Sequence, residues 1–144
     1  MLISESKILI VDDMGTMRRV VGNYLRELGF GNIVEAGHGE EAWEKMQETS
    51  FDLVISDWTM PIMTGIELLR KIRSKEETKK TPFVMLTVEA DKTNIAEALK
   101  YHVDGYLMKP VSFATLSKKL IDVYKRLDPE MSQDLMIAQA KVKV

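Results

Sequence analysis

Short apolar runs alternate along this chain with longer segments in which apolar residues recur every three or four positions. The short runs are rich in β-branched residues and too short for helices, so they predict strands buried on both faces of a sheet. These strands are expected at residues 7–11, 33–34, 51–56, 82–86 and 105–108. The longer segments have the spacing of amphipathic helices, which are expected at residues 17–28, 42–46, 66–72, 93–101 and 113–127.

Strand and helix therefore alternate through five successive units. This alternation predicts a parallel sheet that is covered by helices on both faces, and right-handed crossovers leave few possible topologies. Of the two common doubly wound strand orders, a sheet of five strands favours the flavodoxin-like order 2-1-3-4-5. We therefore predict an α/β, doubly wound (βα)5 domain over residues 1–127.

Residues 128–144 follow this predicted domain. Asp128-Pro129 is expected to end the fifth helix, which leaves residues 128–144 as a C-terminal extension. Met131, Leu135 and Ala138 would line one face of a short extra helix, whereas residues 141–144 alternate as in a strand. A frayed, disordered terminus is the competing interpretation. The sequence leaves both open.

Polar residues close four of the five predicted strands. Asp12 and Asp13 follow the first strand, Asp57 the third, Thr87 the fourth and Lys109 the fifth. In an open α/β sheet, ligands bind at the carboxyl ends of the strands where the strand order reverses, here between the first and third strands. We therefore expect three carboxylates, a hydroxyl and an ammonium group to gather at one edge of the sheet.

Three crowded carboxylates repel one another, and at least one would resist ionising without a cation. A hard divalent ion with oxygen ligands relieves this repulsion, and Mg²⁺ is commonly held by one or two carboxylates together with water and phosphate oxygens. Such an ion would neutralise charge on a phosphoryl group beside it. The sequence therefore predicts a Mg²⁺ site at Asp12, Asp13 and Asp57.

The same edge suggests phosphoryl chemistry. Asp57 is the candidate nucleophile, because carboxylates can accept phosphate covalently. Thr87, one strand away, can donate a hydrogen bond to a phosphoryl oxygen. Lys109 is two strands away, or roughly 10 Å, and its long stem can carry a positive charge across much of that gap.

Composition narrows the function classes further. A chain of 144 residues suits one domain, and the absence of cysteine excludes disulfides, thiolate metal sites and a cysteine nucleophile. The formal net charge of -2 shows no basic excess for nucleic acid. No apolar run approaches a membrane span, and the polar N-terminal residues do not resemble a signal peptide, so we expect a cytoplasmic monomer that binds neither nucleic acid nor membrane.

Taken together, several motifs resemble the receiver domains of two-component response regulators, and most of all the single-domain chemotaxis type. The resemblance covers residues 7–127. It rests on the acidic pair with the stretch that follows it, on the segment after Asp57, on Gly65 and Thr87, and on Tyr106 with Lys109-Pro110.

The resemblance implies a role for each site residue. Asp57 would accept phosphate from the phosphohistidine of a kinase. Asp13, Asp57 and the backbone carbonyl of Thr59 would ligate Mg²⁺ directly, with Asp12 acting mainly through water. Thr87 and Lys109 would bind the phosphoryl oxygens, and Lys109-Pro110 would be a cis peptide. Tyr106 would swing inward when Thr87 moves and would reshape the face formed by the fourth helix, fifth strand and fifth helix.

Further expectations concern partners. Chemotaxis receivers contact the flagellar motor switch through positions that correspond here to Lys92, Ile95, Tyr106 and Lys119. A chemotaxis histidine kinase would be the phosphodonor, and a dedicated phosphatase is a further candidate partner.

Three positions depart from the best-known pattern of the family: Met14 replaces an aromatic, Thr59 an Asn, and Val88 a small Ala. Side chains at Thr59 and Glu89 would flank the water that hydrolyses the phosphoryl-aspartate. We therefore expect these two residues to tune the lifetime of the phosphorylated state.

The leading hypothesis is a phosphorylation-dependent switch that is not a turnover enzyme on an external metabolite. One alternative is a receiver that serves a non-flagellar output or acts as a phosphate sink. A second is a Mg²⁺-dependent phosphohydrolase with an aspartate nucleophile, although such enzymes need a cap or pocket that the short connections here do not offer. A third is a flavodoxin-like FMN protein, whose phosphate loop would be rich in Thr, Ser and Gly where this chain has Asp12-Asp13.

Overall fold

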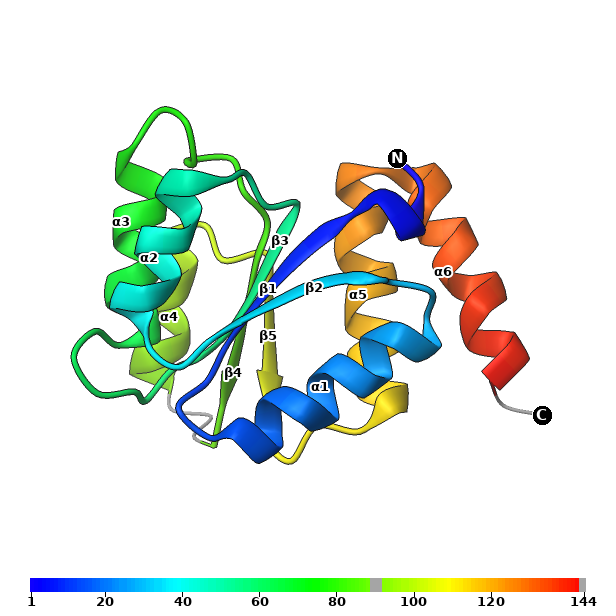
Figure 1. Cartoon of the computed structure of the whole chain (residues 1–144), viewed down its shortest axis with the longest axis horizontal. Coiled ribbons are helices and arrows are strands. Elements are labelled where there is room, and N and C mark those ends of the chain that lie inside the picture. The colour runs from blue at the N-terminus through cyan, green and yellow to red at the C-terminus, as the bar shows by residue number, and fades with distance from the viewer. Residues whose placement is uncertain (89–91, 143–144) are drawn as a thin grey trace.

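The computed structural model describes residues 1–88 and 92–142, and Figure 1 shows how its elements are arranged. One parallel sheet contains β1 (Lys7–Val11), β2 (Asn32–Ala36), β3 (Leu53–Asp57), β4 (Phe83–Thr87) and β5 (Gly105–Met108). The strand order is β2-β1-β3-β4-β5, which confirms the predicted flavodoxin-like α/β fold.

The strand register brings the chemistry-bearing residues to one edge. Val11 pairs with Ser56, Asp57 with Leu86, and Thr87 with Met108. Because all strands run in the same direction, the residues that follow them leave the sheet at its carboxyl edge. The order reverses between β1 and β3, so this is the point at which the loops diverge.

Helices cover both faces of the sheet (Figure 1). On one face lie α1 (Gly15–Glu27) and α5 (Phe113–Leu127), and on the other lie α2 (Gly39–Glu48), α3 (Gly65–Ser74) and α4 (Lys92–Lys100). Alternate strand residues supply the two cores: Ile8 and Ile10 face one set of helices, whereas Leu9 and Val11 face the other. None of these helices, within the described ranges, is long and apolar enough to cross a membrane.

The edge strand β2 is longer than the sequence pattern indicated. It spans five residues, Asn32–Ala36, instead of the two apolar residues at 33–34. Only Ala36 is buried, because an edge strand of the sheet is covered less than the central strands β3 and β4, whose residues are all buried. Pairing with β1, rather than its own apolar content, defines this strand.

The C-terminal extension is a helix, α6 (Pro129–Val142), which packs beside α5 (Figure 1). Met131 and Leu135 are fully buried and belong to the same core cluster as α1 and α5, and Ala138 packs against it. The Ser132 hydroxyl donates to the carbonyl of Ile121 at 2.8 Å. Through residue 142 the extension is therefore neither a frayed end nor a strand, although the predicted apolar face at positions 131, 135 and 138 is present.

Candidate functional site

Three acidic side chains lie together at the carboxyl edge of the sheet. Asp12 and Asp13 directly follow β1, and Asp57 is the last residue of the neighbouring β3. One carboxylate oxygen from each lies within 4.8 Å of the others. Asp12 and Asp57 are nearly buried, at 2% and 7% exposure, whereas Asp13 is exposed. The fold thus brings together the three carboxylates that the sequence singled out.

The ammonium group of Lys109 lies between two of these carboxylates. Its Nζ donates to Asp12 Oδ2 at 2.9 Å and lies 3.2 Å from Asp57 Oδ1. Only 11% of the Lys109 side chain is exposed. The stem of the lysine therefore closes the two-strand gap completely, and the charge reaches the carboxylates themselves.

Burial and neighbouring charges shift the pKa values of Asp57 and Lys109. Burial disfavours the ionised carboxylate of Asp57, and the charge of Asp12 acts in the same direction, so the pKa of Asp57 lies above its ordinary value despite the nearby ammonium. Burial likewise disfavours the charged form of Lys109, but its bonds to Asp12 and Asp57 outweigh this and raise its pKa. Lys109 is therefore protonated at neutral pH.

Asp12 is held by several hydrogen bonds. Its Oδ1 accepts from the amide of Met14 at 2.9 Å, and its Oδ2 accepts from Lys109. Its own amide donates to the carbonyl of Ala36 at 3.1 Å, at the end of β2. These contacts fix the orientation of the Asp12 carboxylate.

Thr87 and Lys109 are joined through the backbone. Thr87 is the last residue of β4 and is only 3% exposed. Its carbonyl accepts a hydrogen bond of 2.7 Å from the amide of Lys109, which follows β5. The Lys109-Pro110 peptide is cis, as the sequence resemblance implied. The predicted hydroxyl and ammonium residues thus occupy adjacent strand ends.

The backbone that carries Asp57 is packed tightly against the start of α3. The amide of Gly65 donates to the carbonyl of Trp58 at 2.8 Å. A Cβ atom at position 65 would lie 2.2 Å from the carbonyl oxygen of Asp57, which no side chain permits. Thr64 and Glu67 form a reciprocal capping box at this helix end. These contacts hold the loop after β3 against Asp57.

The oxygen donors of the cluster formed by Asp12, Asp13 and Asp57 fit Mg²⁺. The side chains that converge there supply carboxylate oxygens, the ligands that this ion prefers. The three carboxylates carry more negative charge when ionised than the single ammonium group of Lys109 offsets. An exposed carboxylate at Asp13 leaves room for water on the solvent side.

The ring of Tyr106 contacts the residue next to Asp57. Tyr106 lies on β5 and is half-buried, and its ring meets that of Trp58 edge to face with the centroids 6.5 Å apart. On the neighbouring α5, the stem of Lys119 lies over Gly105, where an added Cβ would be 3.1 Å from Lys119 Cδ. Lys119 therefore lies on the α5 side of β5, whereas Tyr106 packs against the core cluster on the opposite face of the sheet.

The remaining predicted residues are placed as follows. Thr59 lies two residues past Asp57 with an exposed side chain, and Ile95 is half-buried on α4. Lys92 begins α4, but its side chain lies outside the described structure, as does the whole of Glu89. Val88, which follows Thr87, is 66% exposed.

Sequence reasoning did not single out Arg18 as a site residue. Its guanidinium donates from Nη1 to the backbone carbonyl of Asp12 at 2.5 Å and from Nε to Glu35 at 2.9 Å. The position lies in the first turns of α1, where a solvent-facing arginine is unremarkable in sequence. Only the path of the folded side chain reveals the contact.

Comparison with known proteins agrees with this geometry. Residues 8–121 match the model of the response regulator receiver domain. Chemotaxis protein CheY-3 of Vibrio cholerae is 50% identical over 121 residues, which cover 84% of this chain and 93% of that relative. Chemotaxis protein CheY of Pseudomonas aeruginosa is 44% identical over 122 residues, 85% of this chain and 98% of the relative.

Solved structures support the same assignment. Vibrio cholerae CheY4 superimposes with a TM-score of 0.77 at 37% identity, covering 82% of this chain and 98% of that one. The receiver domain of a Pseudomonas aeruginosa sensor histidine kinase, 27% identical with a TM-score of 0.72, covers 80% of this chain and 93% of that one, and has a magnesium ion coordinated in its active-site cleft. Chemotaxis proteins of the CheY type are thus among its similar relatives, and the chain belongs to the response regulator receiver domain family.

Proposed function

We propose that this protein is a single-domain response regulator in which Asp57 accepts a phosphoryl group from the phosphohistidine of a chemotaxis histidine kinase. The observation that carries the proposal is the position of the Lys109 ammonium, within 3.2 Å of both Asp57 and Asp12. This arrangement supplies a nucleophilic carboxylate and a cation that can bind the incoming phosphoryl oxygens.

In the transfer step, a carboxylate oxygen of Asp57 forms a bond to phosphorus while the bond from the donor imidazole nitrogen to phosphorus breaks. The electron pair of that bond stays on the imidazole nitrogen, which then takes a proton from solvent. Lys109 and the Thr87 hydroxyl bind equatorial phosphoryl oxygens and stabilise the charge on them. Hydrolysis later returns Asp57 to the free carboxylate, and the side chain of Thr59 would flank the attacking water.

Asp13, Asp57 and the backbone carbonyl of Thr59 would hold Mg²⁺, with Asp12 acting through water. When bound, the ion offsets the negative charge that accumulates between the carboxylates and the phosphoryl group. Asp12 keeps its orientation in this role because Met14 and Lys109 donate to its two oxygens.

The signal leaves the site through the hydroxyl of Thr87 and the ring of Tyr106. A phosphoryl group on Asp57 draws the Thr87 hydroxyl toward it, and the ring of Tyr106 turns inward from its present contact with Trp58. The surface of α4, β5 and α5, with Lys92, Ile95, Tyr106 and Lys119, then binds the target. In the view of Figure 1, α6 lies on the side of α5 opposite to α4.

The phosphoacceptor is tested by intact mass. The protein is incubated with Mg²⁺ and acetyl phosphate, and we expect the gain of one phosphoryl group. Asp57→Ala should abolish the gain, whereas Asp122→Ala, an exposed aspartate on α5, should not. Unmodified wild-type protein at every donor and metal concentration would exclude the receiver function. Release of phosphate from p-nitrophenyl phosphate would instead favour a phosphohydrolase.

The partner is tested with the purified flagellar motor switch protein. Beryllofluoride-treated protein should bind it more tightly than untreated protein, and Lys119→Ala should weaken that binding. If both forms bind equally or not at all, a non-flagellar output or a phosphate sink becomes the better assignment.

A further inference from the structure

We propose that Arg18 is a positioning residue for the Mg²⁺ site, because it holds the peptide that joins Asp12 to Asp13. The inference rests on the proposed function of the acidic cluster. The guanidinium is anchored at both ends: Nη1 donates to the Asp12 carbonyl at 2.5 Å, and Nε donates to Glu35 Oε1 at 2.9 Å. Glu35 lies on β2, so Arg18 connects α1, the turn after β1 and the edge strand.

The path of the side chain depends on its surroundings. Helical side chains lean toward the helix N-terminus, and Arg18 accordingly runs back over the first turn of α1. An added Cβ at Gly15 would lie 3.4 Å from Arg18 Nη2, and one at Gly37 would lie 4.0 Å from Nη1. The guanidinium therefore lies beside Gly15, at the start of α1, and near Gly37, which follows β2, and only 23% of the Arg18 side chain is exposed.

The acceptor explains why this contact matters for a metal. The Asp12 carbonyl belongs to the peptide plane between the two neighbouring acids, so fixing its direction also fixes the backbone from which the Asp13 side chain departs. On the other side of Asp12, its amide donates a hydrogen bond to the carbonyl of Ala36. Asp13 itself is exposed, and its orientation consequently depends on the peptide that precedes it. Mg²⁺ demands near-ideal octahedral geometry, so a small rotation here weakens binding.

The positive charge of Arg18 and its positioning role would have opposite effects on Mg²⁺ binding. A positive charge near a cation site, and near the N-terminus of a helix, is unfavourable in itself. If Arg18 acted only as a charge, its removal would strengthen Mg²⁺ binding. If it acts by position, its removal weakens Mg²⁺ binding although a repulsive charge has been lost.

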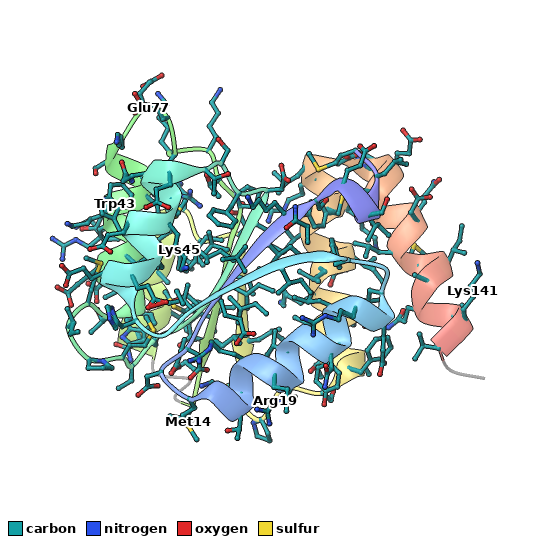
Figure 2. The ribbon with its side chains drawn as sticks, viewed as in Figure 1. Met14, Arg19, Trp43, Lys45, Glu77 and Lys141 are labelled. Atoms are coloured by element: carbon teal, nitrogen blue, oxygen red, sulfur yellow. The ribbon has the colours of Figure 1, made fainter. Side chains whose placement is uncertain are left out.

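The experiment measures Mg²⁺ affinity by calorimetry and by the fluorescence of Trp58, with Trp43→Phe as the common background. We expect Arg18→Gln to weaken Mg²⁺ binding about tenfold, as removal of an outer partner of a metal ligand commonly does. Arg18→Lys, which keeps the charge but not the planar fork, should fall between Arg18→Gln and the wild type. Arg19→Gln is the matched control, because it removes the same charge from an exposed side chain one residue away (labelled in Figure 2). We expect it to leave affinity unchanged or to raise it slightly.

Glu35→Gln completes the test, because Glu35 Oε1 accepts the hydrogen bond from Arg18 Nε. It should weaken Mg²⁺ binding in the wild type and have no further effect in Arg18→Gln. Unchanged or tighter binding by Arg18→Gln would overturn the positioning role, even with Asp57 phosphorylated normally. If the wild type bound no Mg²⁺ and accepted no phosphate, the proposed function would fall and this inference with it. Thermal melts of the metal-free variants show whether the loss of affinity accompanies unfolding.

Discussion

Alanine at position 65 should disable the phosphoacceptor by displacing its backbone. The Cβ atom of the Gly65→Ala variant would lie 2.2 Å from the Asp57 carbonyl oxygen, 2.8 Å from Met85 Sδ and 3.0 Å from Trp58 Cα. Ordinary contact begins at 3.4 Å, so the Asp57 backbone or the start of α3 must shift by about 1.2 Å, the difference between 3.4 and 2.2 Å. The thioether of Met85 can yield, but the two backbone atoms cannot yield without moving the loop.

This shift should lower both the rate of phosphorylation and the free energy of unfolding. A displacement of about 1 Å at a reacting group can slow a reaction about 100-fold, so phosphorylation by acetyl phosphate should fall by about that factor. Overpacking costs about 3 kcal/mol at its upper range, and replacing glycine by alanine in a helix returns about 1 kcal/mol. The free energy of unfolding should therefore drop by about 2 kcal/mol, or about 8 °C in Tm.

The assays are phosphorylation kinetics by intact mass and urea unfolding followed by circular dichroism. Gly31→Ala is the matched control, because nothing lies within 4 Å of a Cβ at that position. It should keep wild-type kinetics and stability. Helix propensity alone would make Gly65→Ala more stable than the wild type. Gly65→Ala with the phosphorylation rate and Tm of Gly31→Ala would refute the claim that the α3 start positions Asp57.

Three further predictions concern stability. Leu135→Ala should lower the free energy of unfolding by about 3 kcal/mol, because Leu135 is fully buried where α6 packs against the core. Ile137→Ala, at a side chain of α6 that is 57% exposed, should change it by less than about 0.5 kcal/mol. Equal effects in urea titrations would mean that α6 does not dock. Arg73→Met should lower the free energy of unfolding by about 3 kcal/mol, measured by thermal melting. The Arg73 side chain is 12% exposed, and its guanidinium donates to Asp104 and to several backbone carbonyls that would lose their donor. A Tm equal to that of the wild type would contradict this prediction. Asp57 has a raised pKa in the folded protein, so its contribution to stability is greatest below the ordinary value of 3.8 and is lost as pH rises through the raised pKa. In metal-free buffer, the Tm of Asp57→Asn should therefore exceed that of the wild type at pH 7, and the difference should shrink toward pH 4. A Tm difference independent of pH would contradict the raised pKa of Asp57.

The central elements were predictable because their signals are local. In β1, β3 and β4 nearly every residue is buried, and a short β-branched run between polar turns records that burial directly. β2 was underestimated because an edge strand is defined by its partner, and its own residues are mostly polar or half-exposed. For α6, Met131 and Leu135 carry the apolar spacing, but exposed Met136 and Ile137 blur it.

The candidate site shows the same division. The positions of Asp12, Asp57, Thr87 and Lys109 follow from strand ends, since parallel strands bring their carboxyl ends to one edge. That Lys109 Nζ reaches both Asp12 and Asp57 could only be bounded from strand spacing, because a flexible stem allows many end points. The edge-to-face contact of Tyr106 with Trp58 joins residues from β5 and the loop after β3, which no spacing along the chain records.

The sequence by itself determined the fold, the carboxyl edge and the residue types that gather there, because periodicity and strand ends are properties of neighbouring residues. Only the tertiary structure decided how those groups meet. It placed the Lys109 ammonium between Asp12 and Asp57, and it raised the pKa of Asp57. It also decided the close approach of Gly65 to the Asp57 carbonyl, the hydrogen bond from Arg18 to the Asp12 carbonyl and the docking of α6. Each of these depends on burial or on contact between distant segments. Burial and long-range contact arise only when the whole core packs, and that is why local patterns could name the groups but not their geometry.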